Sequence, residues 1–275
     1  MVRKHSVYSV GTVAWGVVVF VLTVLIYSGQ AAPFLRPSMF PLGGIPGFIA
    51  FVAGLLVAGA LVIEWLQKRA WVGAGRQVRL EPAERTLYSK PDLVGTVDGR
   101  SVRVRTMKRD SGGGGDSESS TETVTVVETD LDHTPEEGLV IGGQGEDAPS
   151  GMGSMALDLE GQTVGEFAVV GEPAGIAPDV LTERARSALA EPDLNDAVLA
   201  GEASSILLAG VPSFGGGVGD SLSDGLESRL TEAVPGGPEM VRTETSGVLL
   251  DPEEIAAQID AVTAVAQEFE QATAS

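Results

Sequence analysis

The chain has 275 residues, of which 18 are Lys or Arg, 38 are Asp or Glu, and none is Cys. The formal net charge of −20 argues against a nucleic-acid partner, because phosphate backbones attract basic proteins. The lack of Cys excludes disulfides and zinc sites built on thiolates.

Two long apolar runs lie close together at the start of the chain. Val7–Tyr27 and Gly43–Ile63 each contain 21 residues without a charge, and the 15 residues between them carry only Arg36. About 20 apolar residues are needed for a helix to cross the hydrocarbon layer of a bilayer. The runs therefore predict a transmembrane helical hairpin. A cleaved signal peptide is the alternative for the first run, although a second span follows at once.

The positions of the cations predict the topology. Arg3 and Lys4 precede the first run and four cations follow the second. Lys and Arg are enriched on the cytoplasmic side, so both termini and the soluble part are expected in the cytoplasm of a two-span cell-membrane protein. The expected segments are a cytoplasmic tail (1–6), a first transmembrane helix (7–27), an external loop (28–42), a second transmembrane helix (43–66), a β-rich juxtamembrane domain (67–150) and an α+β domain (151–275).

Cations just after the second run form a basic collar: Lys68, Arg69, Arg76 and Arg79. A collar in this place suits contact with anionic lipid headgroups. At molar salt the Debye length is about 3 Å, so only touching charges would attract. The alternative is that the collar serves as a topology signal and forms local ion pairs.

The composition resembles that of proteins from halophilic archaea. From residue 110 onward, four basic residues stand against 33 acidic ones, and the whole chain has only four Lys and one Asn. Concentrated salt screens the self-repulsion of such a charge. A halophilic archaeal source is therefore expected, and an ordinary acidic protein is the alternative.

Small residues recur every four positions in the second run, at Ala50, Gly54 and Ala58. This spacing places them on one helix face, which lets a neighbouring helix approach closely in a membrane. They are candidates for packing against the first span, or against a second copy in a homo-oligomer.

Residues 77–145 are typical of β structure. Val94–Val97 and Ser101–Met107 flank Asp98-Gly99, a pair that favours a two-residue hairpin turn. Val102 and Val104 alternate with arginines, which predicts one apolar and one cationic face. Alternation resumes at Thr121–Glu128, and Gly138–Gly142 supplies another short strand. We expect a small antiparallel sheet of at least four strands.

The C-terminal part alternates between strand-like and helix-like segments. The clearest is a final helix, in which Asp251 caps the N-terminus, Pro252 occupies the first turn, and Glu253 and Glu254 complement the helix dipole. Strands are expected at 155–159, 164–170, 197–199, 204–208 and within 240–250, and helices at 179–191 and 221–233. The overall fold class is therefore α+β.

The final helix carries one apolar stripe: Ile255, Ile259, Val262, Ala266 and Phe269. Docking on the domain's own sheet is the default interpretation of such a stripe. A partner-binding or coiled-coil surface is the alternative, although the pattern spans barely two heptads.

Catalytic chemistry has little support in the sequence. The glycine-rich segment 213–221 has Asp220 where a phosphate-binding loop needs Lys. His133 is surrounded by carboxylates at Glu128, Asp130, Asp132, Glu136 and Glu137. This group could bind a hard divalent cation, but a solvated acidic loop is the preferred interpretation. We expect no enzyme activity and no catalytic, cofactor-binding or metal site.

Several segments after the second run occur in a recognisable order. They are LVGTVDGRSVRVRT (93–106), TETVTVVETDLD (121–132), GLVIG (138–142), VGEFAVVGEPAGIAPDVLTERARSAL (164–189) and SSILLAGVPSF (204–214). With the two preceding spans, this layout resembles uncharacterised two-span membrane proteins of haloarchaea and, more distantly, bacterial two-span proteins. The resemblance implies no catalytic residues.

Two functions are expected from these features. The first is a membrane-anchored cytoplasmic interaction or scaffold protein that contacts lipid and recruits a protein partner. The second is an accessory or sensory subunit of a membrane complex. The apolar runs offer only Ser9, Thr12 and Thr23 as polar groups, so a transport pathway would lack an ion-coordinating residue.

Overall fold

The structure of the chain is a computed structural model that describes residues 15–16, 19, 44–84, 86, 89–111, 120–143, 162–165, 167–173, 175–190, 198–201 and 239–274. It has the α+β class expected from the sequence. The chain divides into two compact units, Met1–Gly73 with Thr86–Lys90, and Ala74–Arg85 with Pro91–Ser275. Each unit is described by itself below.

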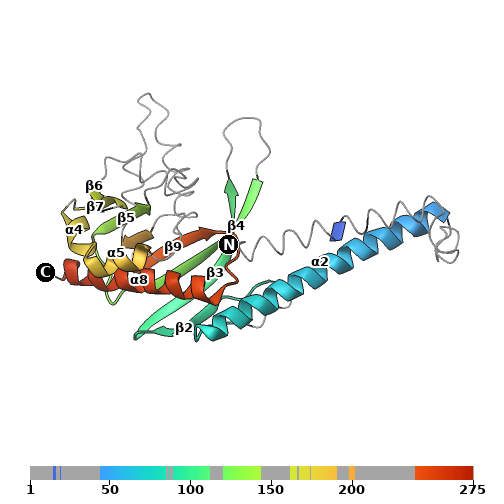
Figure 1. Ribbon diagram of the computed structural model, residues 1–275, viewed down its shortest axis with the longest axis horizontal. Coiled ribbons are helices and arrows are strands. Elements are labelled where there is room, and N and C mark those ends of the chain that lie inside the picture. The colour runs from blue at the N-terminus through green and yellow to red at the C-terminus, as the bar shows by residue number, and fades with distance from the viewer. Residues whose placement is uncertain are drawn as a thin grey trace, which may run out of the picture. The chain divides into compact units, whose positions relative to one another are not determined.

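The dominant element of the first unit is helix α2 (Gly44–Gln77), which is 34 residues long and runs from blue to cyan in Figure 1. Its segment Ile49–Gln77 is long and apolar enough to cross a membrane, and no residue of its most apolar window is buried inside the protein. Pro46 lies in the first turn, where its missing N–H costs nothing.

Helix α2 extends beyond position 66, where the second transmembrane helix (43–66) was expected to end. Gln67, Lys68, Arg69 and Ala70 are good helix formers, so the helix continues although the first three of them are polar. It ends at Gln77 because Arg79 adopts a left-handed conformation, with φ 65°. The Leu80 N–H then donates to the Gly75 carbonyl at 2.8 Å, which closes the last turn in a Schellman arrangement.

The first apolar run is described only at Trp15, Gly16 and Val19, and Trp15 and Gly16 are helical. The expected tail (1–6) and external loop (28–42), and nearly all of the first transmembrane helix (7–27), lie outside the described residues. One candidate span is therefore found in the described part of the chain.

The described residues of the second unit form an antiparallel sheet of nine strands with the order β1-β2-β3-β4-β9-β8-β5-β7-β6. The strands are β1 (Glu81–Pro82), β2 (Leu93–Val97), β3 (Arg100–Ser111), β4 (Ser120–Asp130), β5 (Gly138–Gly143), β6 (Gln162–Val164), β7 (Phe167–Glu172), β8 (Val198–Gly201) and β9 (Met240–Ser246). Strand β9 pairs with β4 and β8. Strands from both sides of residue 150 thus belong to one sheet, across the expected boundary between the 67–150 and 151–275 domains.

The hairpin expected at Asp98-Gly99 is confirmed. Asp98 has φ 51° and Gly99 has φ 85°, as a type I′ turn requires. Val97 pairs with Arg100 on either side of the turn. The side chains of Val102 and Val104 are fully buried, whereas Arg103 is exposed, so the alternation along β3 also holds.

Two expected elements differ in the structure. The single strand expected at 164–170 is instead a hairpin of β6 and β7, because Gly165 adopts φ 65° and turns the chain. The helix expected at 179–191 is two helices, α4 (Ile176–Val180) and α5 (Glu183–Ala190). Pro178 does not precede the first of them but lies within its first turn, where the helix needs no N–H donor.

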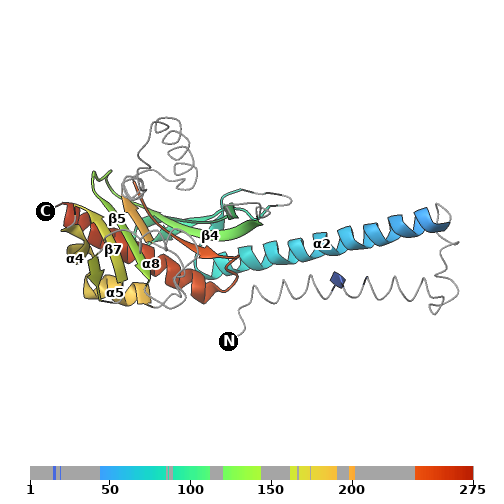
Figure 2. The ribbon, with the colours of Figure 1, turned by 90° about the horizontal axis from the view of Figure 1, so that it is seen from above.

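Helices α4, α5 and α8 (Pro252–Thr273) lie on one face of the sheet (Figure 2). The start of α8 is as expected, because the Asp251 side chain accepts a hydrogen bond from the Glu253 N–H at 3.2 Å and Pro252 occupies the first turn. The main core lies between this helical layer and the sheet. The strands expected at 155–159 and 204–208 and the helix expected at 221–233 lie outside the described residues.

Candidate functional site

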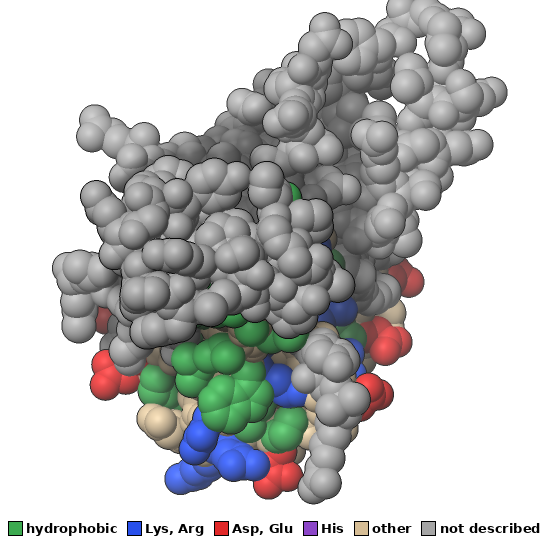
Figure 3. Space-filling model, turned by 90° about the vertical axis from the view of Figure 1, so that its right-hand side faces the viewer, with side chains coloured by type: hydrophobic (Ala, Val, Ile, Leu, Met, Phe, Trp, Pro, Cys, Tyr) green, Lys and Arg blue, Asp and Glu red, His purple; other side chains and the backbone are tan. Residues whose placement is uncertain are grey.

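The most conspicuous surface of the first unit is apolar. Among the side chains of α2 from position 49 onward, eight large hydrophobic ones are exposed: Ile49, Phe51, Leu56, Val57, Leu61, Val62, Trp65 and Leu66. Hydrophobic side chains gather in one patch on the face shown in Figure 3, and Lys and Arg side chains border it. An exposed apolar surface of this extent marks a membrane or an interaction partner as its natural environment.

The described part of the first apolar run meets α2 at a glycine. A Cβ atom added at Gly59 would overlap the indole of Trp15, so the absence of a side chain lets Trp15 approach the helix. Ala50, Gly54 and Ala58 are exposed instead, and a Cβ at Gly54 would meet nothing within 4 Å. These three residues lie on an exposed face of α2. Their role in helix packing stays a prediction.

A polar cluster follows the apolar surface along α2. The Arg69 guanidinium lies over the Trp65 ring, 5.6 Å from its centroid, a cation–π geometry. The Lys68 ammonium donates a hydrogen bond to the Thr86 carbonyl, which brings Thr86 against the helix. The Thr86 hydroxyl in turn donates to the Ser89 carbonyl at 2.6 Å.

Lys90 completes this cluster. Burial lowers the pKa of Lys90, and the nearby Glu64 carboxylate partly opposes this effect. We call Glu64, Trp65, Lys68, Arg69, Thr86 and Lys90 the interfacial cluster. The other two collar residues, Arg76 and Arg79, are exposed at the end of α2 and in the turn that follows it.

In the second unit, charged side chains are buried in the middle of the sheet. Glu128 of β4 is opposite Arg242 of β9, and Arg105 and Glu244 are both opposite Val126. Directly opposed residues in antiparallel strands point to the same face. Arg105, Glu128, Arg242 and Glu244 therefore form a row of alternating charge, the charge ladder.

The ladder lies on the sheet face away from helix α4. Thr129 lies on the opposite face of the sheet from Glu128. Direct pairing from strand to strand places Val241, Ala200, Leu139 and Gly171 on the same face as Thr129. A Cβ at Gly171 would lie 2.6 Å from the Ile176 side chain of α4. Glu128, Arg242 and Glu244 are nevertheless only 2–3 % exposed.

The ladder contains two ion pairs. Arg105 Nε lies 2.6 Å from Glu128 Oε1, and Arg242 pairs with Glu244. Burial raises the pKa of Glu128 above its ordinary value, even though Arg105, Arg242 and Arg103 attract its charge. Slipping one strand by a single residue would move a charge to the other face of the sheet, so the ladder specifies the register of β3, β4 and β9.

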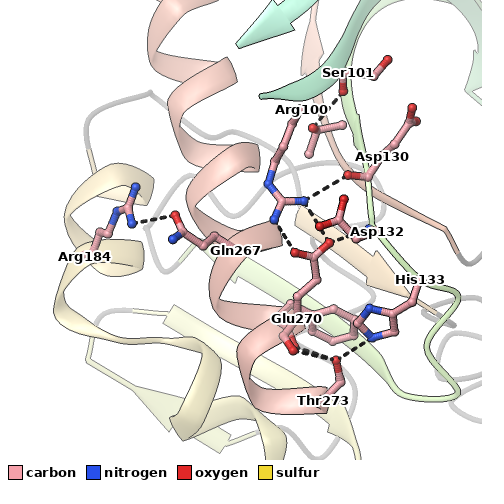
Figure 4. A network of polar contacts seen from close by, with 11 residues as sticks. Arg100, Ser101, Asp130, Asp132, His133, Arg184, Gln267, Glu270 and Thr273 are labelled. Carbon is pink, nitrogen blue, oxygen red and sulfur yellow. Dashed lines mark hydrogen bonds and ion pairs between the residues drawn. The ribbon is translucent and has the colours of Figure 1, made fainter. Parts of the chain in front are cut away.

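A second polar network fixes the end of α8 (Figure 4). Arg100, at the start of β3, forms a bidentate pair with Glu270, and the Asp132 N–H donates to Glu270 Oε1 at 2.6 Å. Burial raises the pKa of Glu270, but these hydrogen bonds outweigh burial and hold that pKa below its ordinary value. His133 Nε2 lies 3.1 Å from the Thr273 hydroxyl oxygen, within the same network.

The carboxylates near His133 in the sequence do not converge on it. Glu128 lies inside the sheet in the charge ladder, and the Asp132 backbone is bonded to Glu270. Within the described ranges, no group of three or more His, Asp or Glu side chains is arranged to hold a metal ion.

The apolar stripe of α8 is buried. Its five members, Ile255, Ile259, Val262, Ala266 and Phe269, are at most 2 % exposed. They pack where α8 crosses β4, β9 and β8. The stripe therefore docks on the domain's own sheet, which is the first of its two interpretations. These five candidate interaction residues are therefore covered by their own domain.

Comparison of the chain with family models, curated proteins and solved structures finds no match. The site must therefore be interpreted from its own geometry. The sequence did not predict the charge ladder or the contact of Thr86 with α2. The only signal for the ladder was the arginine-bearing face of β3, whose partners come from distant strands.

Proposed function

We propose that the chain is a membrane-anchored interaction or scaffold protein, with α2 as an anchor and the sheet unit as the partner-binding part. The observation that supports this proposal is that α2 exposes its large apolar side chains, whereas those of α8 are buried. Helix α2 runs without a break from the apolar segment into residues of the sheet unit.

The proposal includes a second span, formed by the first apolar run, and a cytoplasmic sheet unit. The contact of Trp15 with Gly59 supports a hairpin, because it joins the two runs within one unit. A reporter fused after Ser275 should be digested by protease in inside-out vesicles. Protection of the reporter in those vesicles would contradict the orientation.

The sheet unit offers an arm for a protein partner. Strand β2 pairs with β3 only up to Val104, and β9 pairs with β4 only from Val124 onward. Among the described residues, 109–111 and 120–122 pair only with one another, and they extend as a two-stranded arm (Figure 1). The outer edges of such an arm can accept a strand from a partner.

Affinity purification of the tagged full chain from salt-rich membranes would test this function. The decisive variant joins Lys108 to Thr123 through Asn-Gly, which preserves their pairing and removes the arm. The control replaces only residues 112–119 with a Gly/Ser segment of equal length. We expect the same co-purifying protein with the native chain and the control but not with the shortened arm. Equal recovery by all three would refute the arm as the binding surface.

An accessory or sensory subunit of a membrane complex is the second candidate. It is favoured by the exposed face of Ala50, Gly54 and Ala58, on which another span could pack closely. Gly54→Leu would then release the chain from the complex, whereas an interaction protein that uses the arm would keep its partner.

We also propose that the protein works in concentrated salt, because 33 acidic residues lie from position 110 onward. Thermal unfolding of the full chain should therefore move to lower temperature as KCl is removed. An unchanged midpoint between molar and dilute KCl would contradict the halophilic origin.

A further inference from the structure

The length of α2 determines which of its residues lie at a membrane surface. A helix rises about 1.5 Å per residue, and the hydrocarbon layer is about 30 Å thick. About 20 residues from Gly44 therefore fill that layer and end near Ile63. The next residues, Glu64 to Arg69, reach the level of the lipid headgroups. This step rests on the proposed membrane anchoring.

The groups at this level are those that suit a headgroup layer. Trp65 is 56 % exposed, and its ring carries an apolar body with a polar edge. Arg69 is also exposed and is held over that ring. The cation is thus positioned beside the hydrocarbon boundary before any lipid binds.

Thr86 and Lys90 lie beside this positive surface. The Thr86 carbonyl accepts one hydrogen bond from the Lys68 ammonium, and an ammonium has three donors. The carbonyl therefore orients Lys68 and leaves it able to donate elsewhere. Lys90 lies close to Glu64, so the single carboxylate of the cluster is offset by a cation of its own. Lys68 and Arg69 are the positive charges that remain.

We propose that the interfacial cluster binds the phosphate of an anionic phospholipid, with Lys68 and Arg69 as its direct ligands and Trp65 packed against the upper acyl chain. Two adjacent cations match a phosphate that carries negative charge, whereas a zwitterionic headgroup presents its own cation. Because Lys68 and Arg69 touch the phosphate, the preference persists at molar salt, where charges separated by more than about 3 Å are screened.

The test uses the full chain in vesicles that contain equal amounts of phosphatidylglycerol and phosphatidylcholine. After gentle extraction and affinity purification, mass spectrometry gives the ratio of the two lipids that remain bound. The test variant is Lys68→Gln with Arg69→Gln. The control is Arg103→Gln with Lys108→Gln, which removes two exposed cations from β3. Each protein is measured at low salt and at about 2 M KCl, and again with excess inorganic phosphate.

The native chain and the control should retain phosphatidylglycerol over phosphatidylcholine by about 25-fold, since each of the two cations near anionic lipid contributes roughly a factor of five. The test variant should retain both lipids equally. Equal retention by the native chain, an unchanged ratio in the test variant, or loss of the preference at high salt would overturn the proposal. Displacement of the lipid by inorganic phosphate would also overturn it, in favour of a site for free phosphate.

Carbonate extraction of the same membranes separates this inference from the proposed function. A native chain that resists extraction but shows no lipid preference is still membrane-anchored, and only the headgroup site fails. A native chain that carbonate releases has no anchor, and both proposals then fail.

Discussion

Helices α2 and α8 are both rich in apolar residues, but they meet different surroundings. Val57 of α2 is 59 % exposed, whereas Ile259 of α8 is 2 % exposed. In α8 the apolar residues are covered by strands β4, β9 and β8 together with helices α4 and α5, and Glu253, Glu254 and Asp260 lie on the exposed surface. In α2 the first 20 residues are apolar all round, which no single sheet face can cover. The distribution of apolar residues around a helix, more than their number, therefore indicates its environment.

Introducing one carboxylate into each helix should give the largest contrast. Ile259→Asp places a charge in the sheet core and should unfold the second unit, because an unpaired buried charge costs several kcal/mol. Leu56→Asp, near the middle of the apolar part of α2, should reduce membrane integration by about 3 kcal/mol. Near-UV circular dichroism and carbonate extraction of each variant would separate the two effects.

The comparison fails if Leu56→Asp removes the near-UV signal while Ile259→Asp leaves it intact. The isosteric change Ile259→Leu serves as the control, since it keeps the core apolar and should cost less than about 1.5 kcal/mol.

Disruption of the charge ladder should give the next largest loss of stability. Arg242→Met leaves the buried carboxylates of Glu128 and Glu244 without a cation between them, and breaking a buried pair in this way costs about 3–5 kcal/mol. Arg103→Met removes an exposed cation from the same face and should cost no more than about 0.5 kcal/mol. Urea unfolding of the full chain would measure both. Similar midpoints for the two variants would show that the ladder is not a stabilising unit.

The contributions of two glutamates to folding stability should change with pH in opposite directions. The pKa of Glu270 is lowered from 4.5, so its contribution to stability is present above about pH 4.5 and is lost as the pH falls through the lower folded-state pKa. The pKa of Glu128 is raised from 4.5, so ionisation reduces stability as the pH rises through the higher folded-state value.

Replacing each residue with Gln isolates these contributions. Glu270→Gln should cost about 1 kcal/mol at neutral pH and progressively less below pH 4.5. Relative to the native chain, Glu128→Gln should become more favourable as the pH rises. Urea midpoints across this range would show the two trends, and parallel curves for the two variants would contradict the assigned shifts.

The smallest effect is expected at the start of α8. Asp251→Ala removes the side-chain acceptor of the Glu253 N–H and should cost about 1 kcal/mol. Glu254→Ala changes an exposed residue of the first turn and should cost about half as much or less. Equal losses would mean that charge near the helix dipole, rather than the capping hydrogen bond, stabilises this end.

Local features of the fold could be predicted from the sequence, because the residues responsible are neighbours. Asp98-Gly99 specifies its turn, and Asp251 with Pro252 marks the start of α8. The split at Gly165 was missed because the flanking segments are both strand-like and a single glycine is an ambiguous signal. The end of α2 was missed because hydropathy changes at Lys68, whereas helix propensity does not.

Features of the sites that depend on distant pairing could not be predicted. Glu128 was expected at the end of a strand and was grouped with the acidic residues around His133, but its partners Arg105 and Arg242 come from other strands. Lys68 meets Thr86 only because the chain turns back on α2. Polar strand residues ordinarily face solvent, so nothing local indicated that Arg242 and Glu244 are buried.

The central position of β9 has a consequence for synthesis and folding. The sheet order places β9 between a meander of the first four strands and the group β8, β5, β7 and β6. Asp130 must find Met240 across a long stretch of chain, and such non-local pairing slows folding. On the ribosome, β4 and β8 each present an open edge until residue 246 emerges. The nascent chain therefore exposes two aggregation-prone edges late in translation, and one late strand closes both.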